Sequence, residues 1–325
     1  MCITGCLSTM DITIGNTKIE IFDESNIERE FKEKFTKILI QLLREEISTK
    51  HLKIILIKYE DDDYYSKIYG YIDIDSIEEG EIMGRVSNYT KDTILVINIA
   101  YCSSYVRKFG DDSMVKALRY FLAHELIHYI HIDINARVRL FHKGLERLRR
   151  MYKRKYSEFE RDDSAIRMDS LLRLILLFID NIVIEGYAMF YEEFVKGHIK
   201  FTREFFNSNY GEALKMAELG KRVFKEFMSI KQKKIFMEKI RDIIQREPFV
   251  TLDYKIGFHI IYSLIFLTKK DFAKSPNHIL HLFLTWYGKE KPKRLLGEYE
   301  RRILEFGYKP VIGYSNKSIL NIKKI

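Results

Sequence analysis

The chain has 325 residues, 46% of them hydrophobic, which is enough for one large buried core or two smaller ones. Three cysteines exclude a disulfide framework, and the N-terminus lacks a basic start followed by an apolar run, so we expect a cytoplasmic protein. The formal net charge of +9 is compatible with an acidic partner. No stretch of the sequence is long and apolar enough to predict a membrane span.

The first part of the chain is predicted to form a sheet with one helix packed on it. Apolar residues alternate on both sides of Gly15 and Asn16, which predicts a β-hairpin over residues 11–22. Apolar residues at helical spacing follow over residues 24–47. Further strands are predicted over residues 52–59, 67–74 and 93–100. We therefore assign residues 1–112 to a sheet-rich N-terminal half.

From Ser113 onward the pattern predicts helices almost throughout. Ser113 is expected to cap the first of these helices, which ends near Ile134. The next helix, over residues 135–161, is strongly basic between residues 137 and 155 and could bind an acidic partner. The remaining helices are predicted over residues 165–196, 212–220, 222–246, 255–267, 277–287 and 295–306. Residues 113–325 thus form a helical half, and the fold class is α+β, one unit with a cleft between its halves.

The helix that begins near Ser113 carries an HExxH motif, formed by His124, Glu125 and His128. Residues four apart lie about 40° apart around a helix, so both imidazoles leave one face and can share a metal ion. Glu125 lies beside that pair, where a base can take a proton from a water on the metal. With this composition the motif is expected by chance only about 0.02 times. The alternative explanation is two histidines satisfied within the core.

A catalytic zinc ion usually takes three protein ligands, and Glu185 is the best candidate for the third. Its carboxylate interrupts an apolar run over residues 171–191, where burial is costly without a metal or a basic partner. Gly186 and Ala188 leave room beside it for a second helix or a substrate. A Glu185 paired with an arginine or a histidine is the structural alternative. The weaker candidates for the third ligand are His131, Glu192 and Glu193.

An HExxH helix followed by E-G-x-A-x-x-x-E, which starts at Glu185, resembles the gluzincin clan of zinc metallopeptidases. The likeness is closest to the small soluble gluzincin-type proteases of archaea and bacteria. This resemblance implies a zincin-like fold with a twisted sheet, the HExxH helix and a helical half that carries the third ligand. It also implies that His124, His128 and Glu185 bind one zinc ion and that Glu125 is the general base of peptide hydrolysis. The aspartate that gluzincins place four residues after the third ligand is Met189 here.

The same resemblance indicates residues that would contact the substrate. Gluzincins often place a tyrosine or histidine downstream of the third ligand, and Tyr254, with a glycine three residues later, resembles their Y-x-x-G helix. We expect Tyr254, or in second place His259, to stabilise the oxyanion. Zincins bind extended peptide along an edge strand before the metal helix, a place held here by residues 93–100. Asn98 and Ala100 are therefore expected to pair with the substrate backbone.

These features together predict a zinc-dependent metallopeptidase that acts on a peptide or protein substrate. The rival hypothesis is a basic nucleic-acid-binding or partner-binding protein with a structural or vestigial metal site, based on the charge and the basic residues 137–155. The chain has no recognised nucleic-acid-binding motif, so nucleic acid is not expected as a partner. Glu125 argues against a purely structural site, because such a site has no use for a base beside the metal.

Overall fold

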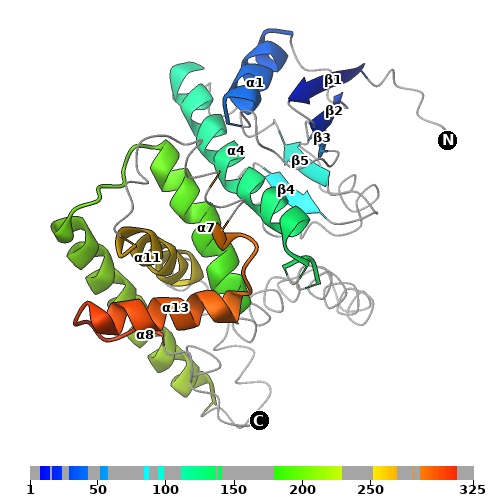
Figure 1. Cartoon of the computed structure of the whole chain (residues 1–325). Coiled ribbons are helices and arrows are strands. Elements are labelled where there is room, and N and C mark those ends of the chain that lie inside the picture. Colours follow the sequence, from blue (N-terminus) through cyan, green and yellow to red (C-terminus); the bar gives the residue numbers. More distant parts are fainter. Residues whose placement is uncertain are drawn as a thin grey trace. The chain divides into compact units, whose positions relative to one another are not determined.

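The computed structural model divides the chain into two units, and each is described by itself. The sheet unit comprises Met1–Arg150 with Leu280–Gly288, and the helical unit comprises Met151–Ile279 with Lys289–Ile325. This division differs from the predicted boundary after residue 112, because the HExxH helix lies in the sheet unit. The residues that the structure describes are 8–14, 17–23, 29–42, 52–57, 84–87, 94–98, 111–136, 138–140, 179–228, 252–268, 281 and 286–312 (Figure 1).

Within the described part of the sheet unit, five strands form a mixed sheet with the order β1-β2-β3-β5-β4. Its strands are β1 (Ser8–Ile14), β2 (Thr17–Asp23), β3 (Leu52–Ile57), β4 (Gly84–Ser87) and β5 (Ile94–Asn98). β1 and β2 are antiparallel with Ile14 opposite Thr17, which confirms the predicted hairpin. β2, β3 and β5 are mutually parallel, and β4 is antiparallel to β5. On β2, Ile19 and Ile21 are both buried, as expected for alternate residues on one face of a strand.

β5 is an interior strand, and this contradicts the prediction of an edge strand over residues 93–100. Asn98 lies opposite Ile57 of β3, and Ile97 lies opposite Gly84 of β4 on the other side. β4 is the outer strand of the described sheet. The sequence did not predict β4, because four residues that begin with a glycine are too short to show an apolar alternation. Ala100 and the strand predicted over residues 67–74 lie outside the described residues.

The sheet unit includes the helices α1 and α4, and α4 carries the HExxH motif. α1 (Arg29–Leu42) buries Phe35, Ile38, Leu39 and Leu42, the helical spacing that the sequence predicts. α4 (Asp111–Ile134) contacts both α1 and β4. It begins two residues before Ser113, so the predicted cap is wrong, since acidic residues are themselves favourable in a first helical turn. The predicted end near Ile134 is confirmed.

The helical unit is organised around α11 (Leu252–Phe266), which contacts α7 (Ile179–Val195), α8 (Arg203–Met228) and α13 (Pro292–Glu305) (Figure 1). Only three of the 15 residues of α11 are not buried, which is typical of a helix that is covered on all sides. α8 runs without a break past Gly220, where the sequence predicted two separate helices. A single glycine weakens a helix but does not end it when the flanking residues pack.

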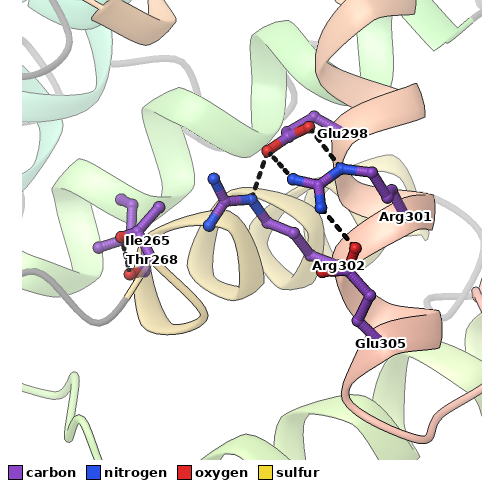
Figure 2. Close-up of polar contacts among 6 residues, drawn as sticks. All are labelled: Ile265, Thr268, Glu298, Arg301, Arg302 and Glu305. Carbon is purple, nitrogen blue, oxygen red and sulfur yellow. Dashed lines mark hydrogen bonds and ion pairs between the residues drawn. The ribbon is translucent and has the colours of Figure 1, made fainter.

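Ion pairs within α13 stabilise this helix. Glu298 accepts hydrogen bonds from Arg301 at 2.7 Å and from Arg302 at 2.5 Å (Figure 2). These arginines, Arg301 first, hold the pKa of Glu298 below its usual range. The hydroxyl of Thr268 donates to the carbonyl of Ile265 at 2.7 Å and satisfies the last turn of α11 (Figure 2). Both features stabilise the helices locally.

These elements are compatible with the α+β class, with a sheet in one unit and a mainly helical second unit. Across the described part of the chain, no helix combines the length and the apolarity needed to cross a lipid bilayer. Of the basic segment over residues 137–155, only residues 138–140 are described, so its predicted role with an acidic partner stays a prediction.

Candidate metal centre

The two histidines of the motif converge as metal ligands do. The Nε2 atoms of His124 and His128 lie 3.2 Å apart, with the ring centroids 4.9 Å apart and the planes at 75°. Two imidazoles on a tetrahedral zinc ion, each about 2.0–2.1 Å from it, place their nitrogens about 3.3–3.4 Å apart. The pair therefore already has the separation that one shared ion requires. A hydrogen bond between the two imidazoles would place their nitrogens at a similar distance. A third ligand near the pair therefore distinguishes a metal site from two histidines satisfied within the core.

The motif interrupts an otherwise buried segment of α4. From Leu122 to Ile132, every residue is buried except His124 and Glu125, which are half-buried. His128, one turn further along, is only 7% exposed. A buried helical segment in which only a histidine and the adjacent glutamate are half-buried favours polar chemistry at those two positions. Glu125 is thus placed where water can reach it.

Glu185 lies in the middle of α7. The residues on both sides of it, Ile184 and Gly186, are buried, whereas Glu185 is half-buried. One ligand atom from each of His124, His128 and Glu185 lies within 4.8 Å of the others, so these residues could hold a metal ion. Two nitrogens and a carboxylate oxygen are a donor set that zinc accepts, and the fourth position is then free for water.

The weaker candidates for the third ligand have other roles in the structure. Glu192 and Glu193 both form ion pairs with Lys196, at 2.6 and 2.7 Å, and Glu193 also lies 2.9 Å from the Nδ1 of His198. These contacts fit a network that closes the C-terminal end of α7. His131 is fully buried on α4, and the metal-binding group found among the described residues does not include it.

Of the two occupants expected beside Gly186, a second helix or a substrate, the structure shows a second helix, α11. A Cβ placed on Gly257 of α11 would lie 2.7 Å from the Cα of Gly186 and closer still to the carbonyl oxygen of Ile182. The backbones of α7 and α11 therefore touch, and only glycine fits on both sides. Tyr254 lies three residues before Gly257, about 60° away around α11, and is half-buried. Its predicted role at the oxyanion stays a prediction.

His259 faces a different part of the helical unit. It lies two residues after Gly257, about 200° around the helix, and is fully buried. Its Nδ1 donates to the Oδ1 of Asn209 at 2.8 Å, and its ring contacts those of Phe206, Tyr210 and Tyr299. Burial lowers the pKa of His259 to about 3. This position in an aromatic core argues against His259 as the group that stabilises the oxyanion.

A His259→Gln variant is expected to flatten the acid dependence of stability. The pKa of His259 is about 3 in the folded protein, so between pH 6.5 and 3 the unfolded chain binds a proton that the folded chain does not. Stability is therefore lost as pH falls through this window, by at most about 1.4 kcal/mol per pH unit. Urea unfolding of both proteins between pH 7 and 4.5, followed by circular dichroism, measures the difference in slope. Parallel stability curves would show that His259 is not buried in its neutral form.

Comparison of the chain with family models, with characterised proteins and with solved structures finds no match. The resemblance to gluzincins therefore rests on the sequence motifs and stays a prediction.

Proposed function

We propose that the chain is a zinc-dependent metallopeptidase with a zincin-like fold. His124, His128 and Glu185 hold the ion, and Glu125 is the general base. The observation that carries the proposal is the group of two imidazoles and one carboxylate whose ligand atoms lie within 4.8 Å of one another. The half-buried Glu125 in a buried segment supports a catalytic rather than a structural site.

The chemistry follows from the residues around that group. A zinc ion held by them would lower the pKa of a water in its fourth position and polarise a peptide carbonyl. Glu125 accepts the proton that the attacking water loses and delivers it to the nitrogen of the leaving amine. The carbon–nitrogen bond breaks as a carbon–oxygen bond forms, so the products are a carboxylate and an amine. Tyr254 is the proposed hydrogen-bond donor to the developing oxyanion.

The substrate is proposed to bind as an extended strand along β4 instead of β5. β4 is the outer strand of the described sheet, and it contacts α4, the helix that carries the motif. The outer strand of a sheet can offer the backbone groups that hold an extended peptide. Asn98 lies on the interior strand β5, so its backbone pairing with Ile57 leaves it poorly placed for this role. The proposed substrate is a peptide or protein of the cytoplasm.

The wild-type chain is expected to hydrolyse peptides only in its zinc form, and Glu185→Gln is expected to need at least about 100-fold more free zinc. Loss of an outer-shell partner alone costs about 10–100-fold in metal affinity, and a direct ligand should cost more. Competition with a coloured chelator measures zinc affinity, and a mixture of fluorogenic peptides measures hydrolysis at each zinc concentration.

The matched control is Glu192→Gln, the same change on the same helix at a carboxylate that pairs with Lys196. It should keep the wild-type zinc affinity. Wild-type affinity in Glu185→Gln would remove Glu185 from the site and return His131 or Glu192 as the third ligand. A wild-type chain that binds zinc but cleaves no peptide would favour the rival, a partner-binding protein with a structural metal.

A further inference from the structure

We propose that the contact between Gly186 and Gly257 positions Glu185 for metal binding, so that both glycines are positioning residues of the site. This inference rests on the proposed function, because it concerns the third ligand of the proposed zinc ion. It assigns a role to Gly257, which lies on a helix that contributes no metal ligand in the proposal.

The first argument is the closeness of the two backbones. At Gly257 an added Cβ would stand 2.7 Å from the Cα of Gly186 and 2.8 Å from its nitrogen. Non-bonded carbon atoms prefer about 3.5–4.0 Å, so one added methyl group must move the helices apart by roughly 1 Å. The neighbours are backbone atoms, and backbone atoms within two helices have no alternative rotamer with which to yield.

The second argument is the place of this contact along α7. Gly186 is the residue directly after Glu185, so a displacement of α7 at Gly186 carries the Cα of Glu185 with it. Metal–ligand distances tolerate changes of only about 0.2 Å. A shift of the size that one methyl group imposes therefore exceeds what the ligand geometry accepts without a compensating rotation of the Glu185 side chain.

The third argument is the contrast with the rest of the same interface and with other glycines. One residue beyond Gly257, the ring of Phe258 lies 6.1 Å from that of Phe190, which adds apolar packing between the two helices. Gly211 on α8 has nothing within 4 Å of where a Cβ would be. A substitution at Phe258 can thus change the stability of the interface between α7 and α11 without changing the distance between their backbones. A substitution at Gly257 changes that distance.

The experiment compares zinc affinity in folded Gly257→Ala, Phe258→Leu and Gly211→Ala. Gly257→Ala is expected to weaken zinc binding at least about tenfold, because it separates the backbones beside Glu185. Phe258→Leu is expected to lower the midpoint of thermal unfolding but to keep the zinc affinity within about twofold. Gly211→Ala should keep the zinc affinity and raise the midpoint of thermal unfolding, since a methyl group there meets open space and alanine favours a helix over glycine by about 0.8–1 kcal/mol. Far-ultraviolet circular dichroism confirms that each variant is folded.

A measurement on the wild-type chain covers the case in which Gly257→Ala does not fold. If displacement of α11 weakens zinc binding, bound zinc must in turn resist that displacement. Hydrogen exchange with and without zinc should therefore show a larger gain in protection at residues 254–258 than in α13. Glu185→Gln, saturated with zinc, should lose this extra gain.

The outcomes separate the two proposals. Wild-type zinc affinity in folded Gly257→Ala, or equal protection of residues 254–258 and α13, overturns the positioning role alone. A wild-type chain that binds no zinc overturns the proposed function, and the positioning role falls with it.

Discussion

Glu125→Gln is expected to retain one zinc ion per chain and to lose peptide hydrolysis by about 10²–10⁴-fold in kcat. The amide has nearly the shape of the carboxylate but cannot accept the proton of the attacking water. Glu125 is half-buried at the opening of α4 and lies outside the metal-binding group, so zinc affinity should not depend on it. Zinc content by elemental mass spectrometry and kcat on a fluorogenic peptide measure the two properties on the same preparation.

Glu192→Gln is again the matched control, because it makes the same chemical change at a carboxylate that pairs with Lys196 and should leave kcat unchanged. Retention of full activity in Glu125→Gln would refute Glu125 as the base. Loss of zinc in that variant would instead show that the Glu125 carboxylate is a ligand, and the assignment of the metal site would need revision.

His128→Ala is expected to bind no measurable zinc and to have no activity. The substitution removes one of two nitrogens that stand 3.2 Å apart and leaves a single imidazole on α4. Because His128 is only 7% exposed, water cannot easily replace the lost ligand. Elemental analysis of wild type and variant, each purified with added zinc and then dialysed, gives the metal content per chain.

His198→Ala controls for the loss of any histidine, since His198 is exposed and lies near Glu193. It should keep one zinc ion per chain. Absence of zinc from both wild type and His128→Ala would indicate that His124 and His128 are core residues and not metal ligands. The net positive charge of the chain would then become the leading indication of its function.

The parts of this fold that depend on neighbours in the chain could be predicted from the sequence. Apolar spacing predicted α1, the HExxH helix and α11, and the turn residues predicted the hairpin of β1 and β2. The helical period alone placed His124 and His128 on one face, as their 3.2 Å separation bears out. A carboxylate in an apolar run indicated Glu185, and the same residue joins the two histidines in the group that could hold a metal.

Features that depend on distant segments could not be predicted in this way. The order of strands is set by pairing between residues far apart in sequence, so the short β4 took the edge that had been assigned to β5. Likewise, a glycine in a helix pattern does not reveal its partner, and only packing showed that Gly257 meets Gly186. The sequence made His259 a candidate for stabilising the oxyanion, yet aromatic side chains of α8 and α13 surround it in the structure.

The sequence by itself determined the chemistry that is available here, because the spacing of two histidines and a glutamate on one helix is a local property. Only the tertiary structure decided which strand lies at the edge, which helix touches the backbone beside Glu185 and which histidine is buried as a neutral core residue. The physical reason is that side-chain burial and backbone contact depend on which elements pack against each other. The sequence of one helix or strand does not identify the elements that pack against it.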